Sequence, residues 1–408
     1  MLRKGTFIPM KTRIQDMTSG SPGRLIILFA IPLMLGNICQ QLYTMVDTMV
    51  VGQVAGVEAL AALGAVDFLM WVVTGISTGL TQGFSIQLSQ YYGAKDFENL
   101  RKSLAHSYRL TAFIAAGVLI LSQSFASLVL TGLHTPSNII GMSLLYLRII
   151  FCGIPATAAY NMFASALRAM GNSKTPLTAM IIASVLNVSL DILFVAGFGW
   201  GVAGAAIATV IAQSFSAVYC FLILRRIDIV HLTRADFMPA SGMNARLMKL
   251  GIPVVFQNII IGVGGLVVQY VINGYGFLFV AGFTATNKLY GLLEMAAISY
   301  GYAIVTYVGQ NLGAGKIDRI RKGVRSSMLL SLLTSLIISA AMFLFGKNIL
   351  SLFISGEPQQ TQQVLESNAE DLNHLMKQNS AYAEDNSAAT QELAAGMEET
   401  SANAAHIV

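Results

Sequence analysis

The chain has 408 residues, of which 55% are hydrophobic and 11% are charged, and its formal net charge is +5. A water-soluble domain cannot bury that share of apolar side chains, so the composition excludes a soluble globular protein. Apolar runs recur that are long enough for the ~20 residues a helix needs to cross a bilayer, and the short alternating strands of a membrane barrel are absent. We therefore predict an all-α, polytopic helical membrane protein.

Segment 1–23 carries four basic residues but no short apolar core with a small-residue cleavage site, so we expect no signal peptide. Beyond it, hydropathy and loop signals predict about nine transmembrane helices. The predicted spans are 24–51, 60–91, 103–130, 139–163, 175–197, 202–224, 246–273, 281–311 and 324–346.

Basic residues are distributed unevenly between the loops. If the N-terminus is cytoplasmic, 21 of the 25 Lys and Arg residues fall on the cytoplasmic side of the predicted spans. Membrane proteins retain Lys and Arg in their cytoplasmic loops, so this asymmetry predicts a cytoplasmic N-terminus. The basic loops are thereby explained by topology, and we expect no nucleic-acid partner. We expect the chain to lie in the bacterial plasma (inner) membrane as a multi-pass protein.

Three motifs recur at offsets of 220 to 224 residues, which is typical of transporters built from two related halves. The pairs are 29–32 with 250–253, 90–94 with 310–314, and 127–132 with 351–356. After the third motif the first half continues for three more helices, whereas the second half stops being apolar at Glu357. The predicted domains are a cytoplasmic N-terminus (1–23), a six-helix N-lobe (24–225), a cytoplasmic interlobe linker (226–245), a partial C-lobe of three helices (246–356) and an acidic, soluble helical tail (357–408).

Two carboxylates occur at similar depth within predicted spans of the N-lobe. Asp47 follows Gln40 and Tyr43 by one to two turns on one helical face, and Asp191 follows Asn187 by one turn. Two acids beside amide and phenol groups can take up a proton or coordinate sodium, as ion antiport requires. The alternative is that each Asp caps a broken helix or hydrogen-bonds a neighbouring helix as structural glue.

Three further charges fall inside predicted spans, where a charged side chain is costly unless it pairs or lines a cavity. Glu294 is a candidate residue of a substrate cavity. It lies six residues after Lys288, about 240° around the helix, so the two are not expected to pair. Arg148 is expected to pair with an acid or to extend toward the membrane surface.

Proline and glycine mark other candidate positions. Pro32, Pro155 and Pro253 sit inside predicted spans, where each removes a helical hydrogen bond. They are candidate hinges, or else fixed kinks that shape packing. Gly93 and Gly313 are interpreted as helix caps.

Several motifs together resemble the multidrug and toxic compound extrusion (MATE) family over residues 1–356. They are 32–52 with Val46-Asp47-Thr48, 89–94, 167–172, 187–191 and 309–314. The resemblance implies twelve helices in two six-helix lobes that export small cationic, amphipathic drugs in exchange for protons or sodium. It also implies that Asp47 and Asp191 belong to the cation site of the N-lobe. No cofactor is implied beyond the coupling ion, and no other metal.

The tail from 357 to 408 has nine acidic residues, one lysine and weak heptads with polar core positions, so it is predicted to self-associate as a coiled coil. It resembles the cytoplasmic signalling helix of methyl-accepting chemotaxis proteins. The candidate methylation sites implied by that resemblance are Gln391, Glu392, Glu398 and Glu399.

The two resemblances conflict, because nine helices would place the tail outside while a chemoreceptor helix works in the cytoplasm. We expect a transporter frame that lacks its last three helices, joined to a receptor fragment by gene fusion or sequence assembly, and therefore poor transport by this chain.

No nucleophile elbow, phosphate-binding loop or zinc-protease motif is present, so we expect no enzyme. The alternatives are a flippase for lipid-linked saccharides and a membrane signalling protein that uses the tail.

Overall fold

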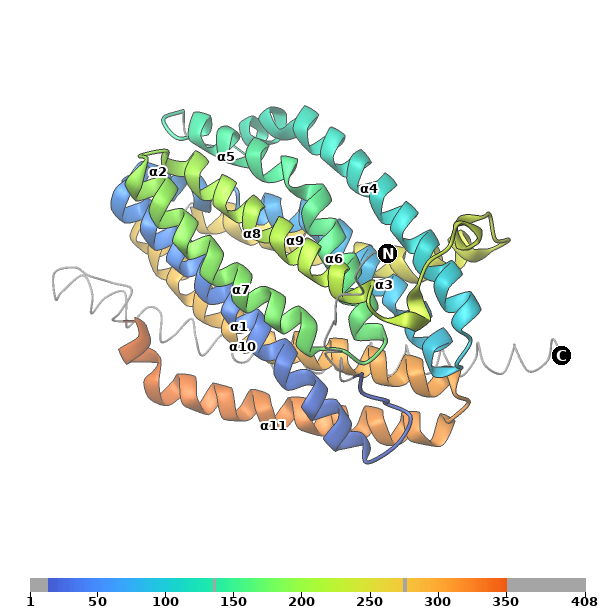
Figure 1. The fold of residues 1–408 in the computed structure, drawn as a ribbon. Helices are drawn as coiled ribbons and strands as arrows, with labels where there is room; N and C mark the ends of the chain where they lie inside the picture. Colours follow the sequence, from blue (N-terminus) through green and yellow to red (C-terminus); the bar gives the residue numbers. More distant parts are fainter. Residues whose placement is uncertain (1–13, 134, 136, 274–276, 351–408) are drawn as a thin grey trace, which may run out of the picture. The chain divides into compact units, whose positions relative to one another are not determined.

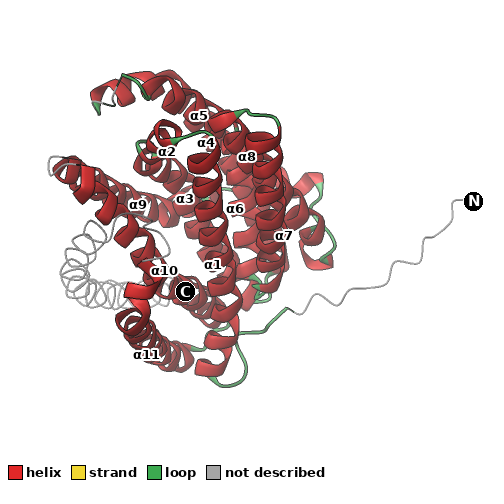
Figure 2. Ribbon diagram, turned by 90° about the vertical axis from the view of Figure 1, so that its left-hand side faces the viewer, coloured by secondary structure: helices red, strands yellow, loops and turns green. Residues whose placement is uncertain are grey.

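The computed structural model describes residues 14–133, 135, 137–273 and 277–350. Within that part of the chain every regular element is helical and no strand occurs, which confirms the predicted all-α fold (Figure 2). The chain divides into two compact units, Met1–Val267 with Ser299–Val324 and Val268–Ile298 with Arg325–Val408. The expected tail features, including its candidate methylation sites, lie outside the described residues.

The first half of the chain forms a bundle of long helices. Their bounds are α1 Pro22–Val54, α2 Val57–Gly64, α3 Asp67–Gly93, α4 Phe97–Gly132, α5 Ile140–Cys152, α6 Ile154–Ala169, α7 Lys174–Asp191, the π-helix η1 Ile192–Gly197, and α8 Gly201–Leu224. α1 begins at Pro22, whose fixed φ suits a first helical turn. α4 begins after Asp96, whose carboxylate accepts the Asn99 N–H at 3.1 Å as an N-cap.

The second half begins with short helices and continues with three long ones. They are η2 Asp228–Val230, η3 Arg234–Phe237, α9 Met243–Asn273, α10 Phe277–Gly313 and α11 Ile317–Leu350. The connecting segment between α8 and α9 is fixed to α4. Arg101 pairs with Asp236 at 3.7 Å, and the two ring nitrogens of His106 contact the Asn244 side chain and the Met238 carbonyl.

The described helices agree with the predicted spans. Seven stretches are long and apolar enough to cross a membrane, and the bent pair of α5 and α6 provides an eighth. The predicted span 281–311 falls on α10, where most side chains up to residue 293 lie outside the described residues. The span predicted at 139–163 is bent by 46° at Gly153, two residues before Pro155.

Two helices of the first unit each pack against two others. α7 packs against both α1 and α8, while α3 packs against α4 and α6 (Figures 1 and 2). In contrast, large apolar side chains are exposed on the outer surface of α4, where Phe113 is 79% exposed and Leu128 67%. Large apolar side chains that face outward along a long helix are expected where the surroundings are lipid.

Candidate functional site

The first unit contains a buried polar cluster that we call the acid cluster: Tyr43 and Asp47 of α1, Asn187 and Asp191 of α7. All four side chains are buried, with Asn187 and Asp191 fully so. They meet because α1 packs along α7 and because each helix presents residues one turn apart on the same face. The two carboxylates and the Tyr43 hydroxyl are close enough to interact electrostatically.

Besides α1 and α7, helix α8 also contacts the acid cluster. Asn187 Nδ2 donates to Thr209 Oγ1 at 3.4 Å, and Gln213 Nε2 donates to the Tyr43 hydroxyl at 3.3 Å. Gln40, which is exposed, lies three residues before Tyr43 on α1 and close to its side chain. Thus the structure brings all five predicted residues of the cation or proton site to one place or its edge.

Several oxygens in the cluster have no hydrogen-bond donor among the described residues. They are both carboxylate oxygens of Asp191, Oδ1 of Asn187 and Oε1 of Gln213. An unsatisfied buried oxygen costs about 1–3 kcal/mol, and a bare buried carboxylate costs more. Protonation of a carboxylate, or a cation bound by these oxygens, would remove that cost. No group of three or more His, Cys, Asp and Glu that could hold a metal occurs in the described part of the chain.

Sequence reasoning missed Thr209, Gln213 and Tyr146. Tyr146 of α5 is buried and interacts electrostatically with Asp47 and Asp191. Gln213 could have been found, because it is an amide in the middle of the apolar run 201–224 and polar groups in a span mark contacts or sites. Thr209 carried no such signal, because a threonine in a transmembrane helix can bond its own backbone.

The other predicted residues lie elsewhere. Glu294 is half-buried on α10 in the second unit, and the Lys288 side chain lies outside the described residues. Pro32 and Pro253 are inside the continuous helices α1 and α9, and Pro155 opens α6 after the bend. Their roles as hinges remain predictions.

A second feature of the first unit is a contact between the repeated motifs, which we call the inner contact: Gln90 and Gly93 of α3 against Gln310 and Gly313 of α10. A Cβ added to Gly93 would collide with the Gln310 carbonyl, and one added to Gly313 would collide with the Gln90 carbonyl. The two collisions are related by the repeat, because each pair of positions differs by 220 residues. The glycines therefore permit close approach of the helix backbones.

These two glycines end their helices as predicted, but they do not supply the left-handed turn of a cap. Positive φ occurs two residues later in each repeat, at Lys95 (φ 59°) and Gly315 (φ 68°). The interpretation of these glycines as helix caps was therefore wrong. Close packing of two helices, and not the geometry of a turn, requires glycine at 93 and 313.

Segment 14–20, which precedes α1, is fastened to the inner contact. The Met17 N–H donates to Gln310 Oε1 at 3.0 Å, and the Met17 carbonyl accepts from Asn311 Nδ2 at 3.0 Å. Gln310 Nε2 donates to the Ala169 carbonyl of α6 at 2.8 Å. Arg319 donates to Asn311 Oδ1 at 2.9 Å. Gln310, Asn311 and Met17 are fully buried, so this network excludes water where the segment meets α6 and α10.

A family model described as MatE matches residues 32–193 and 253–366, more than half of the chain. The chain belongs to the MatE family. The two matched segments begin at Pro32 and Pro253, which are equivalent positions of the internal repeat. The family resemblance found in the motifs is therefore confirmed, and the MatE chain is a multi-pass membrane protein.

Two relatives from Bacillus subtilis are similar over most of this MatE chain. The probable multidrug resistance protein YpnP is 31% identical over 340 residues, which are 83% of this chain and 76% of that protein. The probable multidrug resistance protein YoeA is 28% identical over 349 residues, which are 84% and 75% of the two chains.

The fold is similar to that of a MOP superfamily transporter from Pyrococcus furiosus, with a TM-score of 0.81 and 22% identity. The match covers 88% of this chain and 80% of that one. That transporter is described as having a binding pocket of reverse polarity, which suggests a different function for it. At this identity the likeness establishes the fold, and the chemistry of this MatE chain must come from its own residues.

Proposed function

We propose that this chain exports small organic cations across the bacterial plasma membrane in exchange for protons or sodium ions. The observation that carries the proposal is the acid cluster, with two buried carboxylates and unsatisfied amide and carboxylate oxygens. Buried polar groups that lack partners inside a membrane bundle are costly, and transporters use such groups to bind coupling ions. The multidrug resistance relatives support a drug as the exported substrate.

Either coupling ion can act through the same residues. A proton on Asp191 or Asp47 would neutralise one carboxylate and supply a donor to the other. A sodium ion would take oxygens from Asp47, Asp191, Asn187 and Thr209, the hard ligands that such cations prefer. In both cases the occupied cluster carries one negative charge less, and that difference can favour a different arrangement of α1 and α7.

The basic loops support an orientation with the N-terminus and the inner contact in the cytoplasm. In that orientation the inner contact closes the cytoplasmic end, and it must open for a drug to enter from the cytoplasm. The acid cluster would then exchange its ion with the opposite side while the inner contact is closed.

The acid cluster also argues against a saccharide flippase as the first choice. Anionic lipid-linked substrates need basic groups, whereas the described side chains of the acid cluster are acidic or neutral. A cationic substrate is attracted by the same charges that bind the coupling ion.

The test compares Asp47→Asn and Asp191→Asn with the unchanged chain, because asparagine keeps the shape and removes the charge. Drug efflux in a hypersensitive strain should be lost in both variants at equal expression. In proteoliposomes, a proton gradient alone or a sodium gradient alone identifies the coupling ion. Asp228→Asn, the same change at an exposed position between α8 and α9, is the matched control and should export normally.

A binding readout makes the test independent of turnover. Purified protein should release protons, or release bound sodium, when it binds a cationic dye, and Asp47→Asn should bind the dye without that release. Retention of full resistance by both Asp→Asn variants, or unchanged ion release, would overturn the proposal.

A further inference from the structure

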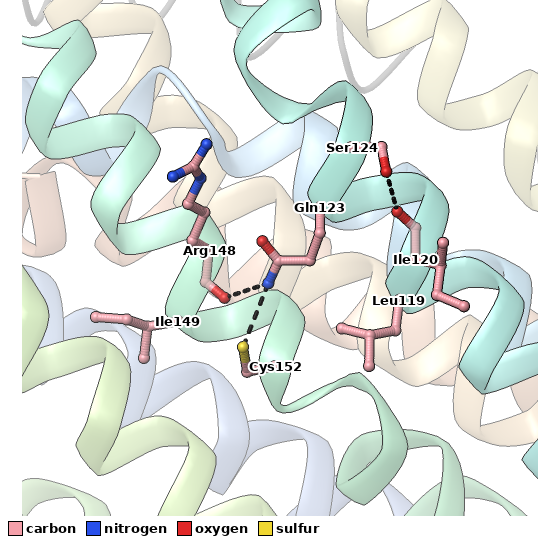
Figure 3. Close-up of a pocket in the computed structure, with 7 residues that line it drawn as sticks. All are labelled: Leu119, Ile120, Gln123, Ser124, Arg148, Ile149 and Cys152. Carbon is pink, nitrogen blue, oxygen red and sulfur yellow. Dashed lines mark hydrogen bonds between the residues drawn. The ribbon is translucent and has the colours of Figure 1, made fainter.

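A groove of about 640 Å³ lies on the surface of the first unit, between α4 and α5 (Figure 3). Leu119 and Ile120 of α4 and Ile149 of α5 form its apolar walls. Arg148 and Cys152, both exposed, also line it. The groove is separate from the acid cluster, because none of its lining residues belongs to that cluster. A groove with apolar walls and one cation is suited to an amphipathic anion.

The helices are fixed to each other at the groove by Gln123 of α4. Its Nε2 donates to the Arg148 carbonyl at 2.7 Å and lies 3.3 Å from the Cys152 sulfur. The Arg148 guanidinium takes no part in this link and extends away from Gln123 (Figure 3). Thus the backbone of Arg148 holds the wall of the groove together while its charge remains available.

The charge of Arg148 has no acidic partner within the described residues. Two ion pairs of the described part join Arg101 to Asp236 and Lys102 to Glu98, both near the opposite end of α4. Arg148 lies eight residues after the first residue of α5, about 12 Å along the helix, so the predicted span 139–163 puts its backbone within the hydrocarbon region. An arginine at that depth is costly unless its guanidinium meets an anion or reaches the surface.

We propose that the groove binds an anionic phospholipid, with the phosphate on Arg148 and an acyl chain against Leu119, Ile120 and Ile149. A phospholipid headgroup is the anion that the bilayer supplies at the end of α5. Arginine forms bidentate, charge-assisted hydrogen bonds with phosphate, and the apolar walls match the hydrocarbon part of the same molecule. The lipid belongs to the leaflet beside the loop between α4 and α5, which is the outer leaflet in the proposed orientation. A bound lipid would brace α4 against the bent pair of α5 and α6.

Cys152 provides a reporter inside the groove. The full chain in dodecyl maltoside is treated with N-ethylmaleimide, and the alkylation of Cys152 is followed by peptide mass spectrometry at increasing phosphatidylglycerol. Cys39 and Cys220, which do not line the groove, are internal references in the same molecules. Phosphatidylglycerol should protect Cys152 selectively, and phosphatidylcholine, which has no net charge, should protect it much less.

The variant Arg148→Gln should need about tenfold more phosphatidylglycerol for half protection, as expected for the loss of one charge-assisted interaction. Arg148→Lys keeps the charge without the planar fork and should fall between the two. Arg225→Gln, the same change at an exposed arginine just after α8, is the matched control and should protect like the unchanged chain.

Any of four results would overturn the proposal, of which three concern selectivity. These three are equal protection by phosphatidylcholine and phosphatidylglycerol, unchanged protection in Arg148→Gln, and equal protection by inorganic phosphate. The last would show that the groove binds a free anion and not a lipid. Absence of protection by any lipid would overturn it as well.

Discussion

Gln310 offers the sharpest test of the inner contact, because one buried side chain makes two hydrogen bonds there. In Gln310→Ala the Met17 N–H loses its acceptor at 3.0 Å and the Ala169 carbonyl loses its donor at 2.8 Å. Each buried group left unsatisfied costs about 1–3 kcal/mol, so the closed arrangement should lose about 2–6 kcal/mol. A loss of about 4 kcal/mol corresponds to a roughly thousandfold increase in local opening.

Hydrogen exchange measures that opening directly. The Met17 amide should be strongly protected in the unchanged chain and should exchange at least about thirtyfold faster in Gln310→Ala, the factor that about 2 kcal/mol gives. Gln123→Ala is the matched control. It also removes a glutamine that donates from one helix to another, but this glutamine joins α4 to α5 at the groove and not at the inner contact. Equal Met17 exchange in Gln310→Ala and the unchanged chain, or equal acceleration in Gln123→Ala, would refute the reasoning.

Two more predictions concern the ends of the bundle near the inner contact. Lys95 holds φ at 59°, so Lys95→Gly should stabilise the protein by about 0.5–1 kcal/mol in denaturant unfolding, while Lys95→Ala should gain nothing because it keeps the strain. Burial raises the pKa of Asp16, but hydrogen bonds from Thr18 and Ser19 and the charge of Lys316 outweigh it, so the pKa of Asp16 lies below its usual 3.8. Its contribution to holding segment 14–20 is therefore complete above the unfolded pKa and is lost as the pH falls through the folded value. Hydrogen exchange of the Thr18 amide should accelerate as the pH falls through that acidic range. In Asp16→Asn, the exchange of the same amide should show no such acceleration.

Much of the architecture could be predicted because a bilayer imposes simple rules on sequence. Apolar length fixed the spans. The repeat indicated that Gln90 and Gln310 are equivalent, but it did not indicate that they touch, since equivalence under a symmetry does not require contact. The sequence also did not indicate why glycine is needed at 93 and 313. Close packing of two helix backbones depends on how the helices meet, and it leaves no pattern in the sequence of either helix.

The acid cluster was partly predictable. The charges of Asp47 and Asp191 are conspicuous in apolar spans, and their similar predicted depth indicated that the two side chains could share one site. The contribution of Thr209 and Gln213 depends on how α8 rotates against α7, which hydropathy does not specify. The attachment of Met17 to Gln310 joins residues 293 positions apart, and the backbone of a methionine has no sequence signature for such a bond.

The two helices that carry the acid cluster both start close in sequence to residues that segment 14–20 joins, and this segment is fastened to the inner contact. α1 follows segment 14–20, and α7 begins three residues after Gly171, whose carbonyl accepts the Gln15 N–H at 3.1 Å. A helix transmits displacement along its axis, so movement of α1 relative to α7 at Asp47 and Asp191 must also load the bond that joins their beginnings. Pro32 lies between the two ends of α1, where its missing N–H weakens the helix and allows part of that displacement to be absorbed by bending. If the acid cluster binds the coupling ion, as proposed, two continuous helices connect ion occupancy to the inner contact without a chain of polar side chains.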